Sequence, residues 1–227
     1  MTYSMGFFRQ FPIFQDLADE ELQEVNDIAN QRDMKKGNVV FHQGEARDAV
    51  FFVISGLIKV YKVSESGQEQ VINFIHSNDM FPHVGFFDDS PYPATAVTLT
   101  DTHLLAIPIE AFENLLIQKP KISIKVMRVM GKKILDLQSR VQQISTKTVF
   151  ERTVSMLIQL TDELGENETS GEITVNLPIT NTDLANMVGV TRESVNRTFN
   201  QLKKANIITY NRNYVIVHDY EALLDRI

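Results

Sequence analysis

The chain has 227 residues and no cysteine, which excludes disulfides, cysteine-ligated iron–sulfur clusters and thiol redox chemistry. Hydrophobic residues make up 43% of it, yet no run of 18 apolar residues and no signal-peptide pattern occurs. We therefore expect a cytoplasmic chain of two modest domains with no membrane partner.

The net charge of −7 is spread unevenly along the chain. Residues 1–118 carry 7 basic and 17 acidic side chains, whereas residues 119–150 carry 8 basic and 1 acidic. Residues 179–217 are also basic, with 5 basic and 2 acidic side chains. Because affinity for a polyanion follows the local field at the contact face, a basic C-terminal segment on an acidic body is compatible with DNA binding.

The first third of the chain changes from a helical to a strand pattern. Residues 1–30 are expected to form short helices, with a helical stripe of apolar residues from Leu17 to Ile28. Short β-branched and aromatic runs bounded by turn residues follow, at 39–41, 49–54, 57–63, 70–75, 94–98 and 103–107. This spacing predicts a rolled or closed antiparallel sheet. Asn78 is one of the turn residues, and asparagine tolerates a left-handed conformation there.

Two helices are expected next, one from Pro108 to Leu116 and a long one from Pro120 to Ser145. One side of the long helix, with Ile122, Val126 and Val129, is expected to cover the chain's own sheet. The other follows the 3-4 spacing of a coiled-coil seam and predicts a parallel homodimer. The seam residues are Met127, Met130, Ile134, Leu137, Val141 and Ile144. The alternative is an amphipathic helix packed only on its own domain.

Residues 146–148 are expected to form a hinge, followed by a helix from residue 149, a surface loop at 162–171 and a strand at 172–177. Residues 180–204 then fit two short helices joined at Gly189, where a positive φ is easily adopted only by glycine. Thr191 suits the N-cap of the second helix.

The second of these helices presents Arg192, Glu193, Asn196 and Arg197 on one face. Arginine can bond guanine, glutamate can accept from cytosine and asparagine can bond adenine in the major groove. A chance match with a solvated face is the alternative. The strand patterns at 207–210 and 214–217 that follow favour a winged helix-turn-helix.

The run from Val190 to Arg197 resembles the recognition helix of the CRP/FNR family of bacterial transcription regulators. The resemblance extends from about Phe11 to the C-terminus and implies an α+β chain. Its expected parts are a cyclic-nucleotide-binding-type β-roll at 1–118, a dimerisation helix at 119–146 and a winged helix-turn-helix at 147–227. It implies a non-enzyme whose partners are double-stranded DNA, a second copy and RNA polymerase.

The resemblance also implies DNA contacts. Arg192 and Arg197 would hold guanines and Glu193 a cytosine of a TGTGA-like half-site in an inverted repeat. Residues expected to contact phosphates are Thr182, Thr191, Ser194, Lys203 and Arg212.

The effector region departs from the family pattern. The family's cyclic-AMP-binding members use a Glu, an Arg and a Ser on the ribose and phosphate, whereas His83, Pro93 and Ala94 stand at these positions. Each lost charge-assisted bond is worth roughly 1.5–3 kcal/mol, so we expect no dependence on cyclic AMP. The candidate effector pocket comprises His83, Val84, Gly85, Phe86, Pro93, Ala94, Thr95, Leu137 and Gln138.

No cofactor or metal is expected. Two alternatives are compatible with the sequence: control by an unidentified small-molecule effector, or constitutive activity without an effector. Some relatives bind haem through a histidine near His83, but a lone histidine is more often structural, and the histidines show no metal-ligand spacing. The aromatic residues Phe81, Phe86, Phe87 and Tyr92 are better explained as core. A cupin-like enzyme would need a metal triad or an activated nucleophile, and the sequence offers neither.

Overall fold

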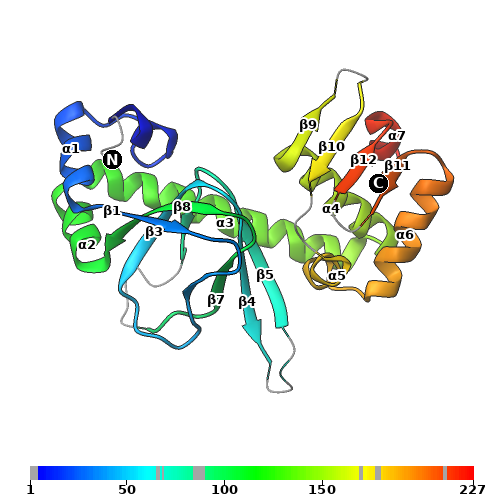
Figure 1. The fold of residues 1–227 in the computed structure, drawn as a ribbon, viewed down its shortest axis with the longest axis horizontal. Coiled ribbons are helices and arrows are strands. Elements are labelled where there is room, and N and C mark those ends of the chain that lie inside the picture. Colours follow the sequence, from blue (N-terminus) through cyan, green and yellow to red (C-terminus); the bar gives the residue numbers. More distant parts are fainter. Residues whose placement is uncertain are drawn as a thin grey trace. The chain divides into compact units, whose positions relative to one another are not determined.

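The computed structural model describes residues 5–64, 67, 69–83, 90–168, 171–176, 180–211 and 214–227, apart from the side chains of residues 5, 6, 140, 141, 143–145 and 163. The chain forms two compact units, Met1–Asp136 and Leu137–Ile227 (Figure 1). Within the described residues, every helix is too short or too polar to span a bilayer.

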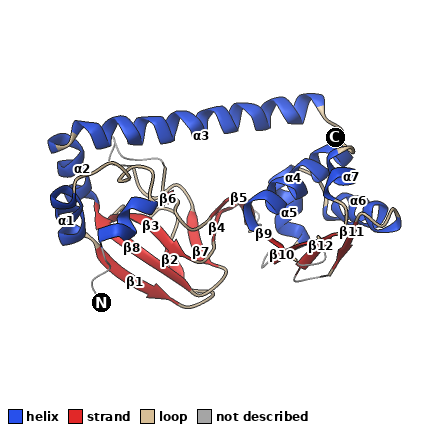
Figure 2. Cartoon of the chain, turned by 90° about the horizontal axis from the view of Figure 1, so that it is seen from above, coloured by secondary structure: helices blue, strands red, loops and turns tan. Residues whose placement is uncertain are grey.

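The first unit is built on two four-stranded antiparallel sheets, which confirms the predicted β-roll (Figure 2). The 3-10 helix η1 (Met5–Gln10) and helix α1 (Asp19–Ile28) precede the strands, as the sequence predicted. One sheet has the order β1 (Asn30–Met34), β8 (Thr102–Pro108), β3 (Ala49–Ser55) and β6 (Met80–Phe81). The other has the order β2 (Val39–Phe41), β7 (Thr95–Thr98), β4 (Ile58–Val63) and β5 (Glu69–Ile75).

Strand β3 separates two hydrophobic cores. Phe51 lies in the inner core between the sheets, with Phe41, Phe81 and Tyr92. Its neighbour Phe52 lies in the outer core. Both faces of β3 are therefore covered, which explains why its sequence is a continuous apolar run rather than an alternating one.

The outer core joins the N-terminal segment to the sheet and the helices that follow it. Phe52 packs against the rings of Phe11, Phe14 and Phe112 at centroid distances of 5.3, 5.1 and 6.1 Å. The Lys125 Nζ lies 2.7 Å from an Asp16 carboxylate oxygen, which adds an ion pair between α3 and the N-terminal segment.

Two strands of the first unit were not predicted. Strand β1 has the sequence Asn-Gln-Arg-Asp-Met, which is polar because β1 lies at the edge of its sheet. Strand β6 has only two residues and is too short to give a pattern. Asn78 adopts the left-handed conformation that asparagine tolerates, with a φ of 69°.

Helices α2 (Ile109–Gln118) and α3 (Pro120–Thr146) follow the roll, as expected. Ile122 and Val126 of α3 are buried in the outer core, and Val129 and Met130 pack partly against it. The prediction that this side of α3 covers the chain's own domain is therefore confirmed.

The second unit contains α4 (Val149–Leu164), α5 (Asn181–Val188), α6 (Arg192–Lys204) and α7 (Tyr220–Leu224). Its sheet has the order β11 (Ile208–Tyr210), β12 (Tyr214–Val217), β10 (Ile173–Asn176) and β9 (Gly165–Asn167). The predicted surface loop at 162–171 was wrong in its first half, because α4 continues to Leu164 and residues 165–167 pair with β10 as strand β9. The polar sequence hid this short edge strand.

Candidate nucleic-acid interface and effector region

The helix-turn-helix is closed by backbone geometry that its sequence specifies. The Thr180 side chain accepts from the Asp183 backbone N–H at 3.1 Å and begins α5. Gly189 ends α5 with a φ of 69°, as predicted. The Thr191 hydroxyl accepts from the Ser194 backbone N–H at 3.2 Å, so the predicted N-cap of α6 is also present.

Helix α6 is buried on one side and polar on the other. Val195, Thr198, Phe199 and Leu202 are buried. They lie with the buried residues of α5, Leu184, Ala185 and Val188, in the core of this unit. Burial of this side orients the opposite side of α6 toward solvent.

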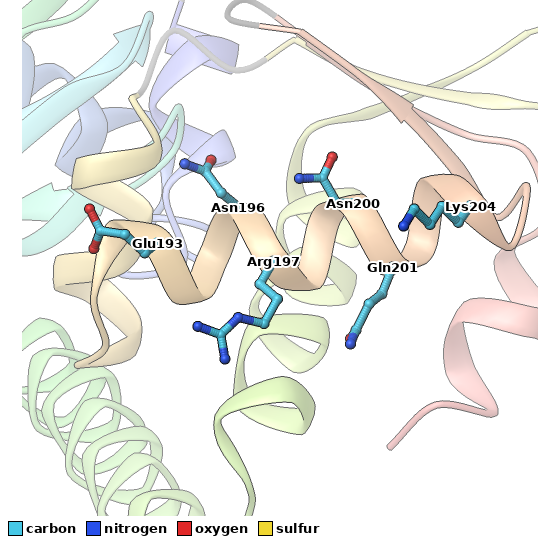
Figure 3. A pocket seen from close by; sticks show the side chains of 6 residues that line it. All are labelled: Glu193, Asn196, Arg197, Asn200, Gln201 and Lys204. Atoms are coloured by element: carbon cyan, nitrogen blue, oxygen red, sulfur yellow. The ribbon is translucent and has the colours of Figure 1, made fainter.

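The polar side of α6 lines a surface hollow of about 460 Å³ (Figure 3). Its lining residues are Glu193, Asn196, Arg197, Asn200, Gln201 and Lys204. Three of the predicted base-reading residues, Arg192, Glu193 and Arg197, are exposed. The sequence analysis missed Asn200, Gln201 and Lys204, although their spacing of three, four and seven residues from Arg197 would have placed them on this side of the helix.

The remaining predicted base reader, Asn196, is half-buried and has a partner within the protein. Its Oδ1 accepts from the Asn181 Nδ2 at 2.6 Å. One turn further along α6, the Asn200 Oδ1 accepts from the Tyr210 hydroxyl at 3.1 Å. Both side chains project from the same side of α6 (Figure 3).

A second hollow connects the two helices with the first wing strand. Thr180, Asn181 and Thr182 line it from the start of α5, Arg192 from α6, and Tyr210 and Asn211 from the end of β11. The backbone N–H groups of a helix N-terminus favour anions, so this position of Thr182 is compatible with a phosphate contact.

The other predicted phosphate contacts differ in their exposure and in their partners within the protein. The Thr191 hydroxyl is already used in the α6 cap and lies 3.1 Å from the Ser194 hydroxyl. Lys203 is exposed, with its Nζ 5.9 Å from the centroid of the Tyr210 ring. Arg212 lies outside the described residues.

The predicted dimer seam on α3 is exposed in the single chain. Met127, Ile134 and Leu137 are 57%, 57% and 59% exposed. Met130 is half-buried at the edge of the outer core. Val141 and Ile144 belong to the same helix, but their side chains lie outside the described part of the structure.

The predicted effector-pocket residues are only partly described. Val84, Gly85 and Phe86 lie outside the described residues, as does Phe87. Pro93 is exposed, whereas Ala94 and Thr95 are buried. The Thr95 hydroxyl accepts from the Gln43 backbone N–H at 3.0 Å. Leu137 and Gln138 are exposed and begin the second unit.

Aromatic side chains fill part of the roll interior. The Tyr92 and Phe41 rings stack with their centroids 3.8 Å apart and an interplanar angle of 7°. The Tyr92 hydroxyl donates to the Asp48 Oδ1 at 2.6 Å, and burial together with this bond raises the pKa of Tyr92 to about 12. Tyr92 and Phe81 are thus core residues, as expected.

His83 lies on the outer-core side of the sheet that contains β3 and β6, away from the inner core. Its side chain lines a cavity of about 40 Å³ with outer-core residues that include Phe11, Phe52 and Met80, and with Val129 of α3. Burial, with a smaller contribution from the Lys133 charge, lowers the pKa of His83 to about 4. A neutral imidazole therefore packs against α3, separate from the inner aromatic core. Among the described side chains, no three His, Asp or Glu residues converge as metal ligands would.

A β-roll, a long helix with an exposed apolar seam and a winged helix-turn-helix define a DNA-binding transcription regulator of the two-domain class. Residues 31–119 match the model of the cyclic nucleotide-binding domain, and residues 151–226 match the Crp-like helix-turn-helix domain.

Similar proteins of known role cover most of the chain. It is 30% identical over 190 residues to the transcriptional activator protein Anr of Pseudomonas protegens, covering 83% of this chain and 77% of the relative. It is 25% identical over 214 residues to the CRP-like cAMP-activated global transcriptional regulator of Mycobacterium tuberculosis, covering 94% and 95%. The structure of FixK2 from Bradyrhizobium japonicum shares the fold, with a TM-score of 0.75, 18% identity and coverage of 88% and 97%. The chain belongs to the CRP/FNR family of transcription regulators.

His83 makes stability dependent on pH. Below about pH 6.5 the unfolded chain protonates this histidine, whereas the folded chain does so only near pH 4. Since the unfolded state binds more protons in this window, the free energy of unfolding falls as the pH falls, by up to about 3 kcal/mol from this group. Urea unfolding of the wild type and of His83→Leu, each at pH 7.5 and 4.5, measures this fall in the free energy of unfolding. The variant should lose less stability between these values, and equal losses would contradict the expectation.

Proposed function

We propose that this regulator acts as a parallel homodimer that binds an inverted repeat of TGTGA-like half-sites, without dependence on cyclic AMP. The exposed Arg192, Glu193 and Arg197 on α6 carry the DNA-reading part of this proposal. Arginine forks suit guanine and a carboxylate suits the cytosine amino group, the bases that such a half-site offers. Two recognition helices of a dimer would then meet half-sites one helical turn apart, ~34 Å.

The two sides of α3 support the dimer. Ile122 and Val126 are already buried against the chain's own core, while Met127, Ile134 and Leu137 leave an apolar row in solvent. A helix with apolar residues on both sides gains free energy when a second copy covers the exposed row. Together with Met130, which is half-buried at the edge of the outer core, this row has the 3-4 spacing of a coiled coil of two parallel helices.

The side chains of the effector region support independence from cyclic AMP. Pro93 and Ala94 offer neither a guanidinium nor a hydroxyl, and the Thr95 hydroxyl is engaged with the Gln43 backbone. A buried cyclic phosphate needs charge-assisted partners to offset the loss of water. Another small molecule, or constitutive activity, is compatible with the same side chains. We propose no resident cofactor, and RNA polymerase as a further partner by analogy with the family.

Replacement of a seam residue tests the dimer. Ile134→Glu should remove apolar burial and place two like charges in the interface, weakening association by about 3 kcal/mol or more, at least about a hundredfold in Kd. Leu135→Glu is the matched control, because Leu135 is 65% exposed but lies beside the seam rather than in it. Analytical ultracentrifugation should give a monomer for the first variant and a dimer for the second. A dimer in both cases would contradict the role of this seam.

Titration into labelled duplex tests the site and the effector together. At ~0.15 M salt, a duplex with an inverted TGTGA repeat should bind at least about a thousandfold more tightly than a scrambled duplex. Adding cyclic AMP should leave both affinities unchanged. Specific binding that requires cyclic AMP would contradict the loss of the phosphate site. If neither duplex binds specifically, the protein uses a different half-site or requires another effector, and selection from random sequences separates these two cases.

Removal of one recognition arginine tests base reading. Arg197→Ala should cost ~1–3 kcal/mol on the specific duplex and relax the preference at one base pair, since a guanine loses its partner. Lys203→Ala, a predicted phosphate contact, should weaken binding about equally on all duplexes. Fluorescence anisotropy against a panel of single-base variants distinguishes the two. An equal loss on scrambled DNA for Arg197→Ala would contradict its base-reading role.

A further inference from the structure

Helix α6 carries a side-chain amide, that of Asn196, whose orientation is set by a residue of helix α5. Asn196 faces the α6 hollow, and its Oδ1 accepts from the Asn181 Nδ2 at 2.6 Å. Asn181 is the first residue of α5 and is half-buried, so its carboxamide meets that of Asn196 where the two helices approach each other. The Asn196 oxygen is therefore turned toward α5, and the Asn196 amino group remains to face a ligand.

This orientation decides which base Asn196 can recognise. An asparagine that reads adenine needs its oxygen for N6 and its amino group for N7. With its oxygen turned toward Asn181, Asn196 presents its amino group, a donor, to the base edges. In the major groove guanine O6 and thymine O4 accept, whereas adenine N6 and cytosine N4 donate at the corresponding positions. A donor amide thus favours the keto bases, which accept at O6 or O4. Adenine keeps one contact through N7 but loses the second bond of the asparagine pair, and cytosine offers no acceptor.

The same arrangement recurs one turn further along α6. The Asn200 Oδ1 accepts from the Tyr210 hydroxyl, and the Tyr210 ring packs edge-on against Phe199 at 5.1 Å. Two successive asparagines on this side of α6 are therefore both turned with their oxygens toward protein partners. Glu193 and the side-chain oxygen of Gln201 are left as acceptors among the residues that line the hollow, beside donors on Arg197 and Lys204.

We propose that Asn181 is a positioning residue that makes Asn196 a hydrogen-bond donor and gives the half-site a keto base at the position Asn196 faces. This rests on the proposed function, in which α6 enters the major groove. It replaces the adenine contact expected from the sequence, because that expectation took both ends of the Asn196 amide to be free.

A single substitution should invert this preference. Asn181→Asp removes the donor, so the Asn196 amide must turn its amino group toward the new carboxylate and present its oxygen to DNA. The selected base should change from guanine or thymine to adenine or cytosine, with a preference of about tenfold in each case. The new carboxylate lies in the first turn of α5, where negative charge is favourable, so the variant should fold.

Selection from random duplexes at ~0.15 M salt, followed by sequencing, measures this for the wild type, Asn181→Asp and Asn196→Ala. Asn196→Ala should lose the preference at that one position. Asn167→Asp is the charge-matched control, since it adds the same charge to exposed strand β9 and should select the same site as the wild type. Thermal unfolding by circular dichroism verifies that each variant is folded, and Asn196→Asp, an acceptor by composition, provides a second route to the amino-base preference.

The outcomes separate this inference from the function on which it rests. If the wild type enriches no inverted repeat, the proposed function fails. If a repeat is enriched but Asn181→Asp selects the same base pair as the wild type at the position that Asn196→Ala identifies, the positioning role of Asn181 is overturned. A switch confined to one base pair in each half-site supports it.

Discussion

The burial of β3 on both faces is the constraint on which the first unit depends. Phe51 and Phe52 are adjacent in sequence and lie in different cores, one between the sheets and one beneath the helices. A shift of one residue in the register of β3 would exchange the two rings and disrupt both cores. The position of α3 follows from this, because Ile122 and Val126 pack in the core that Phe52 occupies. The two-sided strand thus holds the helix that leads to the DNA-binding unit.

In the second unit, the amphipathic helix α6 has the role that β3 has in the first unit, because its burial determines where other residues lie. Phe199 and Leu202 fix the rotation of α6 about its axis, so the direction of Arg197 is determined by hydrophobic packing on the opposite side. Gly189 and the Thr191 cap fix where the helix begins. Specific polar chemistry is therefore positioned by apolar burial and by two local backbone features.

Much of the fold of the two units was predictable from the sequence, because each of these predictions depended on a local pattern. Glycine at 189, threonine at 191 and the 3-4 spacing along α3 specify geometry within a few residues of themselves. Strand β1 and strand β9 were missed because polar edge strands are defined by their partners rather than by their own periodicity. The exposed face of α6 with Arg192, Glu193 and Arg197 was predicted. The Asn181–Asn196 bond, in contrast, depends on the crossing of two helices, and the side of the sheet on which His83 lies depends on strand order. Neither of these two features can be read from the spacing of residues along the sequence.

The two-sided helix α3 also has a consequence for the dependence of stability on abundance. Its buried side contributes to the fold of one chain, and its exposed side would contribute only when a second chain is present. Dimerisation through this helix would make the unfolding temperature rise with protein concentration by mass action. The amount of protein in the cell would then set both how much regulator is assembled and how resistant each molecule is to unfolding.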